Sequence, residues 1–177
     1  MKFKDALQKT FSQFNSPEFI KTIKNKSIIP YLPLLQQITS YGFLPVEYQA
    51  GIARKEQTVI RERAYLTGFM TERQAESFIT NMSVYTDKVA IVVSIVKHVD
   101  LCEIPLTLKI SGKNIEITNR VFTQMFEDDY KGYCEELQIS IKEPLVYLFC
   151  WDPLWDRNAS SPEGLFTQLH GMLKHLS

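Results

Sequence analysis

The chain has 177 residues, 45% of them apolar and 12% aromatic, and its 20 Lys and Arg balance its 20 Asp and Glu. This length and apolar content suffice for one domain with a buried core. A net charge of zero excludes a long-range field that would draw the whole molecule to nucleic acid or anionic lipid, so neither is expected as a partner.

The cysteines and the apolar runs favour the cytoplasm. Cys102, Cys134 and Cys150 lie far apart, form no CxxC motif and leave one over if two pair. Polar residues follow Met1 where a secretory signal would be apolar. The longest apolar run, 89–96, is well short of the roughly 20 residues of a membrane helix. We expect a cytoplasmic protein with no disulfide framework and no cofactor.

The first 43 residues predict a helical N-terminal extension. Apolar residues recur three or four positions apart from Phe3 to Phe14, as on one helix face. A second helix is expected after Ser16, because Pro17 fits its first turn. A third begins near Ile28, and Gly42 ends it. The six lysines of this part predict a solvated face.

The middle of the chain predicts strands. Between 44 and 57 the periodic pattern disappears, which favours a loop. The aromatic and apolar run 63–70 predicts a strand, and a helix capped by Thr71 is expected through Met82. The β-branched run 88–96 is typical of a strand buried on both faces.

The second half predicts a hairpin, a helix, a strand and a last helix. Residues 106–110 and 114–118 alternate around Gly112 and predict the hairpin. Residues 121–137 have helical spacing, 145–151 form an apolar strand, and a final helix opens near Ser161.

The predicted fold is therefore α+β. The element order favours a ferredoxin-like βαββαβ antiparallel sheet with N-terminal helices and a C-terminal helix. An α+β sheet of another topology is the alternative. We expect one domain over 1–177, with the helical extension 1–43 packed on a sheet-and-helix core over 60–177.

Sequence motifs for catalysis or metal binding are missing. No EF-hand, P-loop, GxSxG, HExxH or GxGxxG pattern occurs. His98, Asp100 and Cys102 would share one face of an extended strand, but a structural zinc needs four ligands. We interpret the acidic group 127–129 with Glu135 and Glu136 as a solvated helix face. His170 and His175 point about 140° apart on a helix and are expected at the surface.

The two tryptophans are candidates for a protein contact. Trp151 and Trp155 flank a Pro153 break, and exposed tryptophans often dominate the energetics of an interface. Core packing is the favoured alternative, because tryptophans are mostly buried.

The segment 41–70 contains a more unusual pattern: a Gly-Phe, then Tyr48-Gln-Ala-Gly51, then Glu62-Arg-Ala-Tyr-Leu-Thr-Gly-Phe. It resembles a poorly characterised domain family of large DNA viruses and some bacteria, with Gly-Phe, Ser-Gln-x-Gly and Glu-Arg-Ala-aromatic-x-x-Gly-Phe in this order. The chain departs from that pattern at Tyr48 and at Ala50, which stand where the family has Ser and often Pro. The resemblance implies a viral source but no activity.

The resemblance also draws attention to the positions that carry it. These are Gln49, Gly51, Glu62, Arg63, Gly68 and Phe69.

A ligand site is the hypothesis for four of the polar and aromatic residues in this segment. Gln49 in a loop beside Glu62, Arg63 and Tyr65 could hold a small ligand or a peptide backbone through amide and guanidinium donors. The alternative is structural: Gln49 caps exposed backbone groups and Arg63 neutralises Glu62, which fixes the loop to the sheet.

Two functions of different classes follow. The first is a non-enzymatic accessory module that binds a protein partner or a second copy of itself through the sheet or the tryptophans. The second is a small enzyme or ligand-binding domain with a site around Gln49, Glu62 and Arg63, assisted by His98 or Asp100. An RNA-binding sheet is a third hypothesis, but the strands lack the basic and aromatic pattern of such domains.

Overall fold

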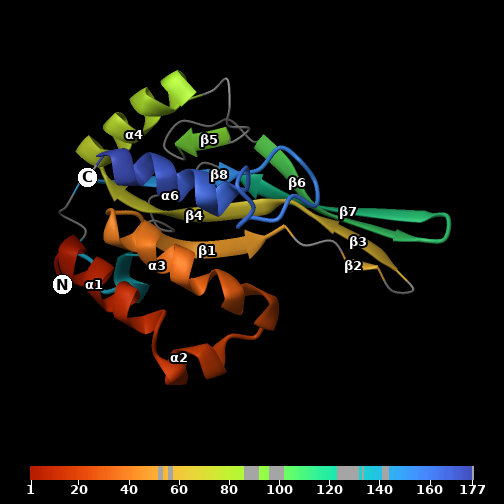
Figure 1. The fold of residues 1–177 in the computed structure, drawn as a ribbon, viewed down its shortest axis with the longest axis horizontal. Helices are drawn as coiled ribbons and strands as arrows, with labels where there is room; N and C mark the ends of the chain where they lie inside the picture. Colours follow the sequence, from red (N-terminus) through yellow and green to blue (C-terminus); the bar gives the residue numbers. More distant parts are fainter. Residues whose placement is uncertain are drawn as a thin grey trace.

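The computed structural model describes residues 1–51, 54–55, 58–85, 92–95, 102–122, 132, 134–140 and 144–176. These residues form helices and two four-stranded antiparallel sheets, which confirms the predicted α+β class. The helices gather around one sheet, and the other sheet projects from the body (Figure 1).

The N-terminal extension is helical, as predicted. Its elements are α1 Phe3–Gln13, α2 Pro17–Thr22, the 3₁₀ helix η1 Lys26–Tyr31 and α3 Leu32–Ser40. Ser16 caps α2, since its hydroxyl accepts a hydrogen bond from the Phe19 amide at 3.3 Å. Gly42, with φ at +94°, follows α3 and turns the chain into the first strand.

The first sheet, called sheet A, forms the centre of the body. In spatial order its strands are β1 Leu44–Ala50, β4 Ala64–Thr71, β8 Leu145–Trp151 and β5 Val92–Ile95. All neighbours are antiparallel. The strand β8 is buried along nearly its whole length, as its unbroken apolar sequence predicts.

The second sheet, called sheet B, is built around the predicted hairpin. In spatial order its strands are β2 Arg54–Lys55, β3 Val59–Glu62, β6 Cys102–Ser111 and β7 Asn114–Phe122. Gly112, with φ at +58°, stands in the turn between β6 and β7. Only Arg63 separates β3 from β4, so one extended run of the chain passes from sheet B into sheet A.

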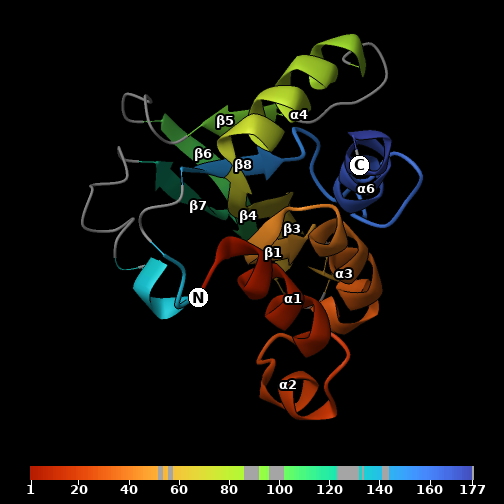
Figure 2. The ribbon, with the colours of Figure 1, turned by 90° about the vertical axis from the view of Figure 1, so that its left-hand side faces the viewer.

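Helices cover one face of sheet A. With α3, the helices α4 Glu72–Tyr85 and α6 Leu165–Leu176 pack there. Leu66 and Leu148 of the sheet lie in one core with Leu35, Phe78 and Phe166 of the three helices. Figure 2 shows α3 and α6 on one side of the sheet and β6 and β7 on the other.

The opposite face of sheet A is covered in two parts. At one end, Phe69 and Tyr147 pack against Phe3 of α1. Toward the other end, Phe149 packs against Ile104 and Leu106 of β6. The first half of the hairpin strand β6 therefore packs on the body, and its second half, toward the turn, projects from it.

The structure corrects two of the predicted elements. Residues 44–50 are the strand β1 rather than a loop. Leu44, Val46, Tyr48 and Ala50 alternate with Pro45 and polar residues, and a register shift between Pro45 and Glu47 accommodates the proline. The helix expected from residue 121 is also wrong at its start, because β7 continues to Phe122.

Other predictions stand differently. Of the helix expected over 121–137, residues 134–136 are helical. Residues 123–131, which make up most of its earlier part, lie outside the described residues. The ferredoxin-like strand order is not confirmed, because the hairpin pairs with β3 in a second sheet. None of the helices within the described ranges combines the length and apolar character that crossing a membrane requires.

Candidate functional site

The six candidate residues lie close together where the two sheets meet. Gln49 of β1 stands opposite Tyr65 of β4, which in turn stands opposite Trp151 of β8. This row crosses sheet A beside Arg63, whose guanidinium carbon lies 4.4 Å from the ring centre of Trp155. We call these five residues the junction cluster. The ligand candidates and the partner candidates, predicted separately, thus share one location.

Gln49 uses its amide on the protein itself. Its Nε2 donates a hydrogen bond to the backbone carbonyl of Arg63 at 3.0 Å. The convergence of Gln49 and Arg63 was expected for a ligand site, but this contact is the backbone cap of the structural interpretation. Arg63 is the residue between β3 and β4. The hydrogen bond therefore holds β1 at the point where the chain passes from sheet B to sheet A.

The side chain of Arg63 is held by two contacts. Its guanidinium stacks on Trp155, and Nη1 donates to the carbonyl of Pro105 at 3.3 Å. Burial lowers the pKa of Arg63, while the charge of Asp152 acts in the opposite direction. Its buried Nε has no hydrogen-bond acceptor among the residues that the structure describes.

The aromatic members of the junction cluster are half-buried rather than free. The ring centres of Phe149 and Trp151 are 5.2 Å apart, and those of Tyr65 and Phe149 are 5.8 Å apart. Tyr65 and Trp151 also pack against the small core that Phe149 forms with Ile104 and Leu106. Trp151 therefore closes the end of a core, as the favoured interpretation predicted.

Glu62 lies next to the cluster and is bound through its backbone. Its amide donates to Asp156 Oδ1 at 3.3 Å, and its carbonyl accepts from the Asp156 amide at 2.9 Å. Asp156 also forms an ion pair with Arg61 at 2.5 Å. The loop after β8 thereby continues the pairing of the β3–β4 run beyond the end of sheet A.

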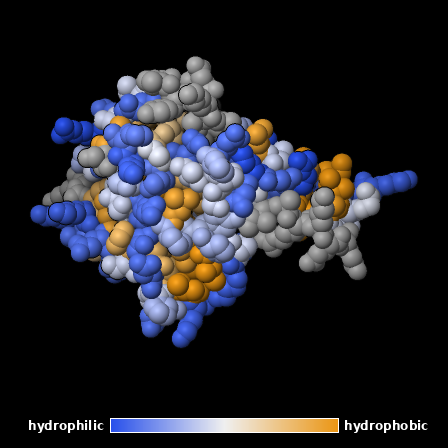
Figure 3. Space-filling view, in the orientation of Figure 1, coloured by the Kyte–Doolittle hydropathy of each residue, from blue (hydrophilic) through white to orange (hydrophobic). Residues whose placement is uncertain are grey.

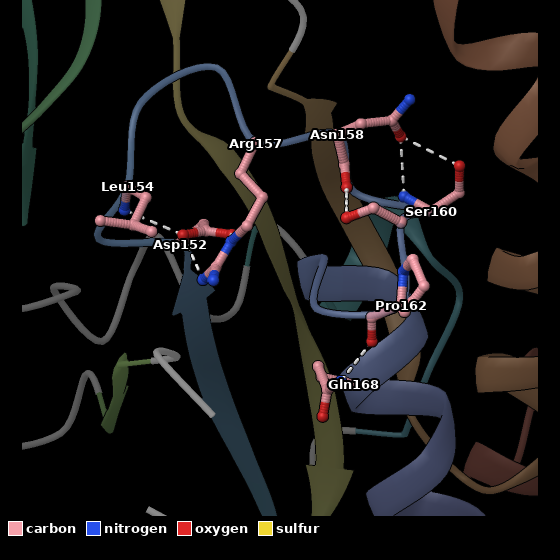
Figure 4. A network of polar contacts seen from close by, with 8 residues as sticks. Asp152, Leu154, Arg157, Asn158, Ser160, Pro162 and Gln168 are labelled. Atoms are coloured by element: carbon pink, nitrogen blue, oxygen red, sulfur yellow. Dashed lines mark hydrogen bonds and ion pairs between the residues drawn. The ribbon is translucent and has the colours of Figure 1, made fainter. Parts of the chain in front are cut away.

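Sequence analysis missed a buried ion pair in that loop. Asp152 is fully buried and accepts two hydrogen bonds from Arg157 and one from the Leu154 amide (Figure 4). The spacing of the polar residues in 152–164 gave no sign of it, because aspartate is common in exposed turns and arginine is mostly exposed in folded proteins.

Asn158 fixes the next part of the same loop. Its Oδ1 accepts hydrogen bonds from the amide and the hydroxyl of Ser160 (Figure 4) and from the hydroxyl of Tyr31 at 3.1 Å. Gln168 of α6 donates to the carbonyl of Pro162. The loop is thus tied to η1 and to α6 as well as to sheet A.

The remaining chemical candidates do not assemble into a site. His98, Asp100 and the acidic group 127–129 lie outside the described residues, and nothing is described of the side chain of Cys102. The rings of His170 and Tyr41 are 5.6 Å apart, and His175 is exposed. Within the described parts of the chain, no three His, Cys, Asp or Glu side chains form a group that could hold a metal ion.

Three hollows of about 590, 440 and 540 Å³ lie around the start of α4, and Gln74 lines each of them. Gln74 also takes part in the helix cap there, since its backbone amide donates to the Thr71 hydroxyl at 3.4 Å. None of the six candidate residues lines these hollows.

Sheet B presents an apolar surface that sequence analysis did not single out. Opposite residues of neighbouring strands share a face, and the registers give two apolar rows. Val59, Ile110 and Ile115 form one row, and Leu108 and Ile117 form the other. We call these five side chains the arm face. Ile115 and Ile117 are 67% and 55% exposed, the highest values among the large apolar side chains that the structure describes.

The opposite face of sheet B is mainly polar, with Ile60 opposite Lys109 as an apolar member. Lys109 and Glu116 stand opposite each other there, with Nζ and Oε2 3.8 Å apart. Figure 3 shows hydrophobic residues near the end of the projecting sheet. The alternation of apolar and polar residues predicted the hairpin. The same alternation occurs whether the apolar face of a strand is buried or exposed, so the sequence could not show that the arm face is exposed.

Comparisons of the chain with protein-family models and with curated protein sequences found no match.

Proposed function

We propose that the chain is a non-enzymatic protein-interaction module that contacts another polypeptide through the arm face. The observation that carries this proposal is the exposure of Ile115 and Ile117 on one face of a sheet that projects from the body. Contiguous exposed apolar patches mark interaction sites, because leaving them in water is unfavourable.

The two-sided character of sheet B supports a binding surface rather than a chance exposure. Its polar face carries the Lys109–Glu116 pair, while the arm face contains the β-branched residues that pack well between sheets. A sheet with one apolar and one polar face is stable when the apolar face is covered. A partner that covers the arm face would complete a second layer.

The contacts of the junction cluster and of the loop after β8 support a structural role for that location. The Gln49 amide is bound to the Arg63 carbonyl, and the Asp152 carboxylate is bound by Arg157. A catalytic acid, base or nucleophile has to reach a substrate, and these groups are already engaged in holding the sheets and the loop together.

The cytoplasmic location and the viral source belong to the same proposal. The first rests on the spacing of the three cysteines, which favours a reducing compartment. The second rests on the resemblance of the segment 41–70 to a domain family of large DNA viruses. Together they favour an accessory protein that works in the cytoplasm of a host cell.

Site-specific photocrosslinking in the producing cells tests the proposed surface. A photoreactive phenylalanine analogue replaces Ile115 on the arm face in one variant and Glu116 on the polar face in the other. The two positions are adjacent on β7 and both exposed, so they differ in the face that they label. We expect covalent protein adducts from position 115 at several times the yield from position 116.

Equal yields from the two positions, or none from either, would overturn this function. The Ile115→Ser variant provides a further control, because loss of a largely exposed side chain should leave the fold intact. Circular dichroism and the thermal midpoint of that variant should match those of the wild type.

A second candidate function is the binding of a small anion at Arg63. The observation that favours it is the buried Nε, which has no acceptor among the described residues while Nη1 donates to Pro105. A carboxylate or phosphate oxygen would satisfy this donor and would be attracted by the guanidinium charge.

Nuclear magnetic resonance can observe that nitrogen directly. The Arg63 Nε–H resonance, assigned with the Arg63→Lys variant, is followed while inorganic phosphate or succinate is added. Saturable movement of this resonance supports anion binding, and an unchanged resonance with both anions excludes it.

A further inference from the structure

The chemistry of the arm face identifies its partner. We propose that a second copy of this chain covers it, with two B sheets packing face to face about a two-fold axis. This inference rests on the proposed function and names the partner at the same surface. Each copy would present the same five apolar side chains to the other, as a two-fold interface requires.

The arm face is complementary to itself because its five side chains are aliphatic and its charges lie only at the β2–β3 end. Lys55 stands opposite Val59 at the end of the first row, and Arg61, at the end of the second row, is neutralised by Asp156 at 2.5 Å. The Lys109–Glu116 pair lies on the other face of the sheet. A surface built for a charged partner would carry charges of the opposite sign. The total charge of zero also means that two copies do not repel each other at long range.

The shape of the molecule allows two arms to meet. Sheet B projects from the body, so its outer part lies away from the helices (Figure 1). Packed sheets lie about 10 Å apart and interdigitate their side chains. Ile115 and Ile117, near the hairpin turn, would lie within that interface and lose most of their contact with water.

The size of the face sets the strength of the expected dimer. Stable interfaces bury about 800 Å² on each partner, whereas an apolar patch of five partly exposed side chains covers only a few hundred. The dimer should therefore dissociate on dilution. We expect a reversible equilibrium with a dissociation constant in the micromolar range, rather than a permanent assembly.

The edge of sheet B offers a competing mode of self-association. The strand β7 is nine residues long and pairs with β6, while the other edge, β2, is two residues long and basic. Long unprotected edges can pair with another strand. Edge pairing would extend the sheet without covering the arm face, so it would leave Ile115 and Ile117 exposed. Burial of the apolar rows favours packing of the faces.

Sedimentation velocity of the full chain over a wide concentration range tests the inference. Two variants place the same charge at adjacent positions of β7: Ile117→Lys on the arm face and Thr118→Lys on the polar face. We expect the wild type and Thr118→Lys to form dimers as the concentration rises. Ile117→Lys should weaken the dimer by about tenfold or more, because the added charge would be buried near its copy. Circular dichroism checks that both variants are folded.

Two results would overturn the inference. One is a wild-type chain that stays monomeric at every concentration. The other is equal loss of the dimer in both lysine variants, which indicates edge pairing. Neither result decides the proposed function, since adducts of a different protein from position 115 would still support it. Conversely, dimers formed without adducts at position 115 would contradict both.

Discussion

Arg157 binds Asp152 through two parallel hydrogen bonds, from Nε to Oδ2 at 2.5 Å and from Nη2 to Oδ1 at 2.6 Å, and the carboxylate is fully buried. The backbone amide of Asp152 donates to the carbonyl of Ala64, the first residue of β4. The ion pair therefore fixes the loop after β8 at the position where the two sheets meet.

Removing the charge of Asp152 should be strongly destabilising. Asp152→Asn leaves the Arg157 guanidinium without its buried counterion, and breaking such a pair costs about 3–5 kcal/mol. Chemical denaturation with a two-state fit measures this loss in the free energy of unfolding.

The second Arg–Asp pair of the loop provides a matched control. Arg61 and Asp156 are also 2.5 Å apart, but their side chains are 43% and 23% exposed. Asp156→Asn should cost about 1 kcal/mol or less, because water screens an exposed pair. Equal losses from the two variants would show that the burial of Asp152 is not the reason for its effect.

Gly51→Ala should destabilise the protein more than Gly112→Ala. Both glycines have positive φ, at +69° and +58°, where a Cβ costs about 1–2 kcal/mol. At Gly51 the new Cβ would also lie 2.7 Å from the Ala64 amide nitrogen and 2.8 Å from the Arg157 carbonyl oxygen. At Gly112 it would meet no atom within 4 Å. We expect an additional loss of about 1–3 kcal/mol at Gly51, from differences in denaturation midpoint. Similar midpoints would argue against close packing of the loop there.

The stability of the protein should fall above pH 10, in part because of Tyr48. Burial raises the pKa of Tyr48 above its ordinary value, which is about 10. Above that pH the unfolded chain releases a proton that the folded chain retains, so the free energy of unfolding decreases as the pH rises. The decrease continues until the pH passes the folded pKa.

Tyr48→Phe should remove this contribution, which is at most about 1.4 kcal/mol for each pH unit. Denaturation curves at pH 8 and at pH 11 measure the change for both proteins. Burial also raises the pKa of Tyr31, so a smaller fall should persist in the variant. An unchanged fall in Tyr48→Phe would show that another group causes it.

Cys150 should not react with thiol reagents while the protein is folded. The residue lies in the main core between sheet A and the helices, and burial raises the pKa of its thiol. The thiolate is the reactive form, so both its access and its concentration are low. Mass spectrometry after brief alkylation at pH 8 should find Cys150 unmodified, and modified once denaturant is present. Rapid alkylation of Cys150 in the native protein would contradict its placement in the core.

The sequence by itself determined the local elements with strong periodicity or a clear cap. The N-terminal helices, α4, the hairpin and β8 could be predicted because spacing, Ser16, Thr71 and Gly112 each act within a few residues. The strand β1 could also have been found from its alternation, had Pro45 not obscured it.

Tertiary structure alone decided how the sheets pair and which apolar faces are exposed. The change from sheet B to sheet A at Arg63, the Asp152–Arg157 pair and the exposure of Ile117 depend on partners far away in the chain. Their sequence patterns are the same whether the residues meet those partners or water. The candidate residues Gln49 and Trp155 could be chosen from the sequence. Only the fold brings the Arg63 carbonyl to the Gln49 amide and the Arg63 guanidinium to the Trp155 ring.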